Sequence, residues 1–352
     1  MRLCALHTGC ETYLDHLGVL SILLDIPLIV TEPETFRLAQ IFYPQLKCFL
    51  KSPLDLSLEF LAINYDGLMT SGHYLAAEMT PLFDLLFGKK MRMIYCPHGN
   101  SDKGYSFKET PPKDITLVYG HHMLDLLKKT KALDRISTYI ITGNFRSYFY
   151  LTHKPFYDQL IQTLLFPYLN KKKKTLLYAP TWSDKENISS FFTCCEKIIE
   201  NLGPRFNLII KLHPFLKEQA LAYTSYLKDK FEDKKNIIFL SDCPAIYPLL
   251  EHCDGYLGDF SSIGYDMLFF EKPMFFFGSH CGPIYQCGQE IPLKADILKF
   301  IESNWEWNKN YFKSNRKDVY KYAFGTEFSK GKIEKEIKRA LYSYRALSEK
   351  IS

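Results

Sequence analysis

The sequence lacks the features that mark several specialised classes of protein. Its ten cysteines are scattered among 352 residues without a C-x-x-C pair, which excludes a dense disulfide framework and the ligand spacing of a zinc site. No apolar run reaches the roughly 18–20 residues of a membrane-spanning helix. The longest run near the N-terminus, residues 17–30, is interrupted by Asp25 and Pro27, and residues 3–6 are too short for a signal-peptide core. We therefore expect a cytoplasmic protein with reduced thiols.

Charge and phosphate-binding motifs are also sparse over most of the chain. Residues 309–350 carry twelve Lys or Arg against five Asp or Glu, whereas the whole chain has a net charge of only +5. The first 308 residues are therefore close to neutral, which argues against nucleic-acid binding. There is no Walker loop and no G-x-G-x-x-G, so any bound phosphate would have to rely on helix N-termini. No paired carboxylates, metal cluster or Cys-His dyad indicates a hydrolase or metalloenzyme.

Short apolar segments alternate with helical stretches along most of the chain. This alternation predicts an α/β fold in which helices cover both faces of parallel sheets. The lysine run at 171–174 is typical of a solvated connector and divides the pattern into two similar halves. We expect a first domain over residues 1–150, a linker over 151–174, a second domain over 175–320 and a C-terminal helix over 321–352. The expected strands are 3–7, 26–30, 66–72, 91–96, 115–118, 139–141, 175–179, 207–212, 236–240, 255–258 and 274–277.

Unusual residues follow four of these strands, where open α/β sheets bind their ligands. A single histidine in such a place is more often a capping or packing residue, but His98 and His213 come from different halves and could meet across a cleft. Ser261 and Ser262 stand at an expected helix start, where hydroxyls and free N–H groups suit a phosphate or pyrophosphate. Simple N-capping is the alternative. Phe260 stands two residues before Ser262, so this is not the G-x-S-x-G elbow of a hydrolase.

Four segments carry the most distinctive residues of the chain: His98-Gly99-Asn100-Ser101-Asp102-Lys103, residues 177–184 with Pro180 and Thr181, Lys211-Leu212-His213-Pro214, and residues 254–266 with Asp259, Ser261 and Ser262. These segments resemble sequence boxes of the CDP-glycerol:polyol-phosphate glycerophosphotransferases, the family of teichoic-acid polymerases and primases. The resemblance extends over residues 90–340, with shorter similarities at 143–146, 271–273 and Gly325.

The resemblance implies a GT-B-type fold, with two Rossmann-like domains and the active site between them. The first domain would bind the acceptor and the second the nucleotide-linked donor. The implied reaction transfers a polyol phosphate, such as glycerol phosphate, from a CDP-linked donor to a hydroxyl of a lipid-linked or glycan acceptor. It implies neither a metal ion nor a further cofactor. In GT-B proteins the last helix typically packs back on the first domain, and we expect the same of residues 321–352.

The resemblance also gives roles to individual residues, listed here by substrate. His98 would be the catalytic base, and His213 would act with it by stabilising the leaving CMP. The donor would be bound by Pro180, Thr181, Lys211, Asp259, Ser261 and Ser262, and the acceptor by Gly99 and Lys103. For three residues a purely structural role is the alternative. Lys103 could be a surface lysine, Asp259 could orient the serine loop, and Trp182 could be core packing rather than a stacking partner for the base.

Two questions remain open at the level of sequence. The chain could instead be a GT-B glycosyltransferase or epimerase that uses a nucleotide-sugar, or a non-catalytic GT-B binding module, because fold does not decide the donor. The basic tail has apolar residues at Ile333, Ile337, Leu341 and Tyr344, a spacing that predicts an amphipathic helix. Its basic face could meet an anionic membrane on the inner, cytoplasmic side, or could simply be solvated.

Overall fold

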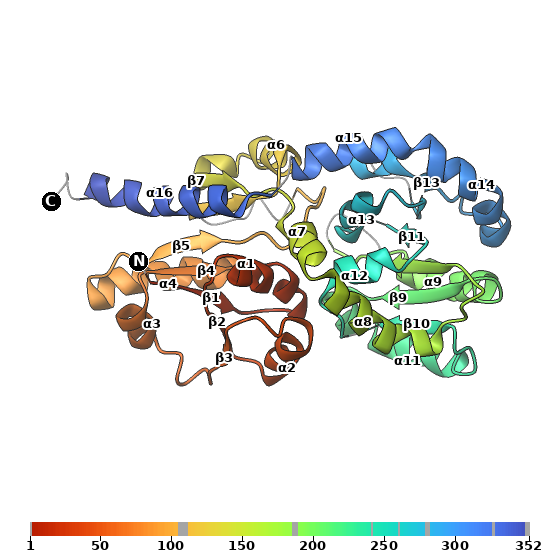
Figure 1. Ribbon diagram of the computed structural model, residues 1–352, viewed down its shortest axis with the longest axis horizontal. Coiled ribbons are helices and arrows are strands. Elements are labelled where there is room, and N and C mark those ends of the chain that lie inside the picture. The colour runs from red at the N-terminus through yellow and green to blue at the C-terminus, as the bar shows by residue number, and fades with distance from the viewer. Residues whose placement is uncertain are drawn as a thin grey trace. The chain divides into compact units, whose positions relative to one another are not determined.

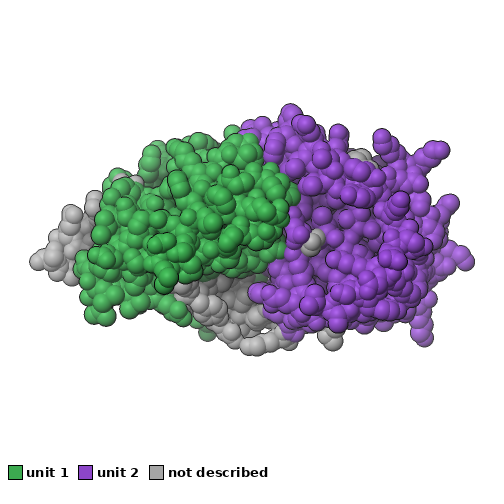
Figure 2. Space-filling model, turned by 90° about the horizontal axis from the view of Figure 1, so that it is seen from below, with its two compact units in different colours: residues 1–100, 104–149, 323–352 green, residues 101–103, 150–322 purple. Residues whose placement is uncertain are grey.

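The computed structural model describes residues 2–104, 112–184, 189–240, 242–259, 261–278, 282–325 and 328–348, apart from the side chains of 73–77, 166 and 343–348. The chain divides into two compact units, coloured separately in Figure 2. Unit 1 comprises residues 1–100, 104–149 and 323–352, and unit 2 comprises 101–103 and 150–322. Residues 151–174, which we expected to be a linker, are part of unit 2, because helix α8 (Lys154–Leu165) buries Tyr157, Ile161 and Leu165.

Unit 1 contains a parallel sheet of seven strands in the order β3-β2-β1-β4-β5-β6-β7. Its central strands are apolar at successive positions, as in β1, where Cys4, Ala5 and Leu6 are all buried. A strand that is buried on both faces has no polar side to turn to water, so helices must cover both faces of the sheet. The strands are β1 (Leu3–His7), β2 (Leu28–Val30), β3 (Cys48–Leu50), β4 (Gly67–Thr70), β5 (Arg92–Tyr95), β6 (Lys113–Val118) and β7 (Ile136–Ile141).

Helical structure in unit 1 begins with two elements between β1 and β2. The 3-10 helix η1 (Glu11–Asp15) ends at His16, and the chain continues as α1 (Leu17–Leu23). The others are α2 (Pro33–Phe42), α3 (Leu58–Asn64), α4 (His73–Phe87), α6 (His121–Lys129), η2 (Leu133–Arg135), α7 (Phe145–Thr152), which extends into unit 2, and α16 (Lys330–Ser348).

The C-terminal helix α16 packs on the sheet of unit 1, alongside β7 (Figure 1). Ile333, Ile337 and Leu341 are buried, as the amphipathic spacing predicted, and Tyr344 lies outside the described side chains. Arg92 fastens the helix to β5, because its guanidinium donates to the carbonyl of Leu341 at 2.8 Å while also pairing with Asp114.

Unit 2 contains a second parallel sheet, of six strands in the order β10-β9-β8-β11-β12-β13. The strands are β8 (Thr175–Ala179), β9 (Asn207–Lys211), β10 (Ile237–Leu240), β11 (Gly255–Gly258), β12 (Met274–Phe276) and β13 (Gln289–Glu290). The remaining helices are η3 (Phe166–Tyr168), α9 (Phe191–Leu202), α10 (Pro214–Gln219), α11 (Leu221–Lys230), α12 (Ile246–Glu251), α13 (Ile263–Met267), η4 (Leu268–Phe270), η5 (Pro283–Cys287), α14 (Ile297–Tyr311) and α15 (Lys313–Phe324).

The two sheets share one topology. Each begins in the middle, runs outward through two strands to one edge, and then returns to add the later strands on the other side of the first. This is the strand order of a doubly wound, Rossmann-type sheet. In such a sheet the chain leaves neighbouring strands in opposite directions at the switch point, which opens space for a ligand beyond the carboxyl ends. The predicted α/β class with two Rossmann-like domains is confirmed.

Candidate functional site

His98 lies just beyond the carboxyl end of β5 in unit 1, where two tyrosines surround its ring. The hydroxyl of Tyr95 lies 3.3 Å from His98 Nδ1, and the ring of Tyr13 lies 4.7 Å from the imidazole centroid at a tilt of 36°. The side chain remains exposed to solvent. The ring is thus held on one nitrogen and one face while it stays accessible to a substrate.

The surroundings of His98 keep its imidazole uncharged. Two effects together lower the pKa of His98 to about 4: desolvation by the packed neighbours, which is the larger, and the positive charge of Lys113. The pKa of Lys113 is itself lowered to about 7, first by desolvation and then by Arg135. Since a histidine must be neutral to accept a proton, His98 is in the protonation state of a general base at neutral pH.

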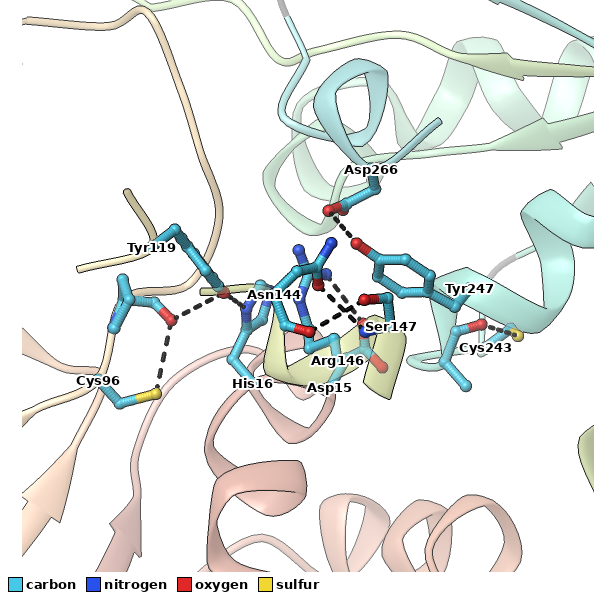
Figure 3. A network of polar contacts seen from close by, with 12 residues as sticks. Asp15, His16, Cys96, Tyr119, Asn144, Arg146, Ser147, Cys243, Tyr247 and Asp266 are labelled. Carbon is cyan, nitrogen blue, oxygen red and sulfur yellow. Dashed lines mark hydrogen bonds and ion pairs between the residues drawn. The ribbon is translucent and has the colours of Figure 1, made fainter. Parts of the chain in front are cut away.

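A buried polar network in unit 1 supports the segment before His98 (Figure 3). The hydroxyl of Tyr119 contacts His16 Nδ1 and also lies 3.5 Å from the carbonyl of Pro97. Arg146 pairs with Asp15 at 3.1 Å and lies over the ring of Tyr119, with 5.6 Å between Cζ and the centroid. Both charged partners are almost fully buried, so removal of either would leave an uncompensated charge.

Sequence reasoning did not find most of this network. Arg146 stood in the weakly matching segment 143–146, but Asp15, His16, Tyr13 and Tyr119 carried no motif. A signal was available in retrospect, because His16 and Asp15 interrupt an otherwise apolar helical stretch. Buried polar groups of this kind need partners, and only the tertiary structure shows that they come from 100 or more residues away.

Gly99 is placed by its backbone. Its φ of 141° lies in the region that side chains rarely adopt, so the turn after His98 requires glycine. The next residue, Asn100, is buried and donates from its side chain to the carbonyl of Ala323 at 3.0 Å. The turn that presents His98 is therefore fixed at both ends within unit 1.

His213 lies in unit 2 just beyond the carboxyl end of β9, the strand that pairs with β8 on the side opposite to β11. Its Nδ1 accepts a hydrogen bond from the backbone N–H of Phe215 at 3.2 Å and so caps helix α10. A ring nitrogen that accepts cannot carry a proton, so His213 carries its single proton on Nε2. Trp182 stacks against the ring, with 6.1 Å between centroids and 29° between planes. His213 is thus oriented as a hydrogen-bond donor through Nε2.

Lys211 is nearly buried at the end of β9, and its ammonium donates to the carbonyl of Cys243 at 2.8 Å. This contact holds the segment that leads into α12. Trp182 is partly buried against the hydrophobic core of unit 2 while it also contacts His213, so packing and ring stacking are not exclusive for this residue.

Asp259 is buried beneath the loop that carries the two serines. Its carboxylate accepts from the backbone N–H of Thr181 at 2.6 Å and from the backbone and hydroxyl of Ser190 at 2.9 and 2.7 Å. Desolvation raises the pKa of Asp259, although these donors oppose the rise. Asp259 therefore joins the end of β11 to two other places, the segment after Pro180 and the start of α9. Pro180 is buried at the end of β8. These contacts favour the orienting role considered for it.

Ser261 and Ser262 are half-buried and precede α13. Ser262 occupies the N-cap position without a side-chain capping bond, and Ser261 Oγ accepts a long bond of 3.4 Å from the N–H of Ile263. Because α13 spans only five residues, its dipole contributes little, and any phosphate here would depend on hydroxyls and local N–H groups. Phe260, between Asp259 and this pair, lies outside the described residues.

Lys103 is anchored among the donor-box residues of unit 2. Its ammonium pairs with Asp184 at 2.6 Å and donates to Thr181 Oγ1 at 3.0 Å, and it lies 5.3 Å from the ring centroid of Trp182. The Lys103 side chain is 12% exposed and that of Asp184 is 1% exposed. Lys103 is therefore not a loose surface lysine, and its charge is largely compensated by Asp184.

Among the residues that the structure describes, no group of three or more His, Cys, Asp or Glu side chains could hold a metal ion. The helices in this part of the chain include none that is long and apolar enough to cross a bilayer.

The fold and the candidate residues indicate a structural class of protein. Two Rossmann-type units, with histidines beyond strand ends in each, are typical of the GT-B-type fold. The structure of the wall teichoic acid polymerase TagF is similar over 100% of this chain and 90% of that chain, with a TM-score of 0.65 and 16% identity. The UDP-GlcNAc 2-epimerase from Neisseria meningitidis is similar over 97% and 100%, with a TM-score of 0.56 and 14% identity. At these identities the likeness shows the GT-B-type fold alone.

Sequence comparison is more specific. Residues 120–283 match the model of the family described as CDP-glycerol:poly(glycerophosphate) glycerophosphotransferase. The teichoic acid glycerol-phosphate primase of Bacillus spizizenii is 33% identical over 110 residues, which are 31% of this chain and 26% of that protein. The predicted family resemblance is thus confirmed, and its matched region includes three of the four boxes. The chain spans about a quarter of the length of the curated relatives it matches.

Proposed function

We propose that the chain transfers a polyol phosphate, glycerol phosphate in the first instance, from a CDP-linked donor to a hydroxyl of a lipid-linked or glycan acceptor. The observation that carries the proposal is the match of residues 120–283 to the glycerophosphotransferase model. That region contains His213, Asp259 and the Ser261–Ser262 pair, whose geometry suits an anionic donor. His98 lies outside it, and its role rests on the first box and on its neutral, accessible ring.

The proposed reaction is a displacement at the β-phosphorus of the donor. The oxygen of the acceptor hydroxyl forms a bond to that phosphorus, and the bond from phosphorus to the bridging oxygen of CMP breaks. His98 takes the hydroxyl proton on its imidazole, and CMP leaves with the electron pair of the broken bond. The atoms balance without a metal ion or redox partner.

The residues of unit 2 act on the charge that grows on the leaving group. His213 can donate from Nε2 to a phosphate oxygen, since its Nδ1 is already engaged by Phe215. The hydroxyls of Ser261 and Ser262 can donate to the same phosphates. Hydrogen bonds to charged groups stabilise a transition state more than neutral ones, and fixed donors need no reorganisation during the reaction. Lys211, Asp259 and Lys103 hold the surrounding loops in place.

Ligand-induced stabilisation separates this proposal from its main alternative. CDP-glycerol should raise the melting temperature, and CMP should do so less, because a ligand bound only by the folded state shifts unfolding upward. UDP-GlcNAc should have little effect. Release of CMP and transfer of glycerol phosphate to an added acceptor should follow. Stabilisation by UDP-GlcNAc without CDP-glycerol would instead support a nucleotide-sugar enzyme, as the likeness to the epimerase allows. Stabilisation without turnover would support a binding module.

We further propose that unit 1 meets an anionic membrane surface that carries the acceptor. On α16, Lys335, Lys338 and Arg339 are exposed while the apolar side is buried. Each basic residue near an anionic surface contributes about 1 kcal/mol of binding. Apolar side chains are also exposed on α3 and α4, with Ile63 at 62% and Leu85 at 79% exposed. Basic and apolar groups together are what interfacial binding requires.

Co-sedimentation with vesicles tests the membrane proposal. The protein should bind vesicles that contain phosphatidylglycerol, bind weakly to neutral phosphatidylcholine vesicles, and be released as salt is raised. Changing Lys335, Lys338 and Arg339 to Gln should weaken binding by more than tenfold. The matched control changes three exposed lysines of unit 2 to Gln, Lys197, Lys228 and Lys235, and should bind like the wild type. An equal loss of vesicle binding in both variants would mean that net charge, and not the position of the basic residues on α16, causes the binding. No binding at low salt would refute the membrane proposal.

A further inference from the structure

Two buried polar side chains occupy neighbouring positions in the middle of the sheet of unit 1, outside the four sequence boxes. His7 ends β1, and Ser71 directly follows β4, the strand that pairs with β1 in parallel (Figure 1). This pairing matches Ala5 with Met69, so the same register carried two residues further matches His7 with Ser71. Matched residues of parallel strands lie on the same face of a sheet. The two side chains are 0% and 1% exposed.

Both side chains have hydrogen-bonding capacity that the fold does not use. Among the residues that the structure describes, none makes a hydrogen bond of ordinary geometry with either ring nitrogen of His7 or with Ser71 Oγ. The backbone of Cys10 acts on the imidazole, but a carbonyl can only accept, so the second nitrogen still lacks a donor. Ser71 opposes the rise in the pKa of the Cys96 thiol, yet sulfur is a weak partner. Since buried polar groups are normally paired, two such neighbours mark a candidate ligand site.

The electrostatic surroundings of His7 indicate which ligand fits. Burial lowers the pKa of His7 to about 4, and the smaller effects of Glu32 and Glu11 oppose it. The imidazole is therefore neutral at pH 7, with one nitrogen that donates and one that accepts. Both charges that act on it are negative and repel an anion. A hydroxyl group is uncharged, donates once and accepts as well, which matches what His7 and Ser71 offer.

The pair also lies where a sheet of this topology binds ligands. The chain runs from β1 outward to β3 and then adds β4 on the other side of β1, so β1 and β4 flank the switch point. The turns that follow the pair come close to the surface, because Thr8 and Gly72 are half-buried and Gly9 is exposed. These turns adjoin one another, since a Cβ on Gly72 would lie 3.1 Å from Thr8 Oγ1. Only the turn after β1 has to shift for a small ligand to reach His7.

We propose that His7 and Ser71 bind a hydroxyl group of a neutral polyol, and that this polyol is part of the acceptor. The second clause rests on the proposed function, which places the acceptor at unit 1, whereas the first clause does not. The ring of Tyr13 links the two, because its centroid lies 6.1 Å from that of His7 and 4.7 Å from that of His98. A polyol held by His7 is thus one tyrosine ring away from the proposed base.

Glycerol, a small neutral polyol, is the probe that tests the site without turnover. In protein labelled with ¹⁵N-histidine, the ring signals of His7 are identified by their loss in His7→Leu. Glycerol should shift these signals until they saturate, while inorganic phosphate at equal ionic strength should not. Ser71→Ala should weaken glycerol binding about three- to tenfold, because one uncharged hydrogen bond is lost. The matched control is Ser21→Ala, which should bind like the wild type, since Ser21 is equally buried but donates to the carbonyl of Leu17 at 2.7 Å.

Three results of the titration would overturn the proposal. If glycerol leaves the His7 signals of the wild type unchanged, the pair takes no more than a water molecule. If phosphate shifts them and glycerol does not, the site binds anions. If Ser71→Ala and Ser21→Ala lose the same affinity, the loss reflects a general change in unit 1 and not the hydroxyl of Ser71.

Transfer assays test the clause about the acceptor. Glycerol should act as an acceptor of glycerol phosphate from CDP-glycerol, or compete with one, and Ser71→Ala should raise its KM or inhibition constant by the factor seen in the titration. The KM for CDP-glycerol should not change. Binding of glycerol without any effect on transfer, or a raised KM for CDP-glycerol alone, would refute the acceptor clause. If the wild type releases no CMP, the proposed function fails, and the titration still decides whether the pair binds a polyol.

Discussion

The two candidate histidines each follow the carboxyl end of a strand, His98 after β5 in one sheet and His213 after β9 in the other, and their surroundings differ. His213 is tied to the backbone of its own chain segment, because the N–H of Phe215 two residues later binds Nδ1. His98 is held by two side chains, that of Tyr95 three residues earlier on β5 and that of Tyr13 on η1. A backbone contact orients His213, whereas side-chain contacts, one of them from a distant element, orient His98. Position after a strand therefore predicts a site but not the role of the residue in it.

The largest expected effect comes from removing His98, the proposed base. His98→Ala should lower kcat by about 10²–10⁴-fold, the usual contribution of general acid–base catalysis. Affinity for CDP-glycerol, measured by titration calorimetry, should change little, because the donor is assigned to unit 2. If the variant turns over CDP-glycerol at close to the wild-type rate, His98 is not the catalytic base.

Removing the donor histidine should act on binding and on the rate. His213→Ala loses a hydrogen bond to a charged phosphate, about 1.5–3 kcal/mol, or about ten- to a hundredfold in kcat/KM. Affinity for CDP-glycerol should fall as well, which His98→Ala should not cause. Unchanged donor affinity would place His213 away from the phosphates. Circular dichroism should check that the lost cap of α10 has not unfolded the segment.

The serine pair provides a ligand-specific version of the same test. Changing Ser261 and Ser262 to Ala should weaken CDP-glycerol binding by up to about a hundredfold, because two donors to phosphate are lost. Free cytidine has no phosphate, so its affinity should barely change. A similar loss for both ligands would indicate damage to the fold or to the base pocket instead.

The smallest effect is a shift in pH dependence. With the pKa of His98 near 4, its imidazole stays neutral and able to accept a proton well below pH 6.5. Lys113→Met removes a positive charge that disfavours imidazolium, so the pKa of His98 should rise from about 4 toward 6.5. The acid limb of kcat/KM should move to higher pH in the same direction. NMR titration of the ring measures the shift directly, and an unchanged or lowered pKa would contradict the electrostatic role of Lys113.

Much of the fold was predictable because strands that are buried on both faces leave a strong apolar signature. Segments such as residues 175–179 and 207–211 are apolar at most positions, and every residue of both is buried. The strands that were not expected, β3 and β13, lie where the signal is weak. Strand β3 has only three residues, two of them exposed, and β13 has only two residues. The prediction that residues 151–174 form a linker rested on the exposed lysine run at 171–174. The helix before that run buries apolar side chains and belongs to unit 2.

By itself the sequence determined the α/β class, the two Rossmann-type units and the four boxes, because these depend on local apolar patterns and on residues close together in the chain. The tertiary structure decided what the box residues touch. It joined Lys103 to Asp184, and Asp259 to Thr181 and Ser190, across 69 to 81 residues of sequence. It also gave Arg146 its partner Asp15 and His98 its tyrosine neighbours. A buried charge or a ring nitrogen takes its state from atoms within a few ångströms, and those neighbours exist only once the chain has folded.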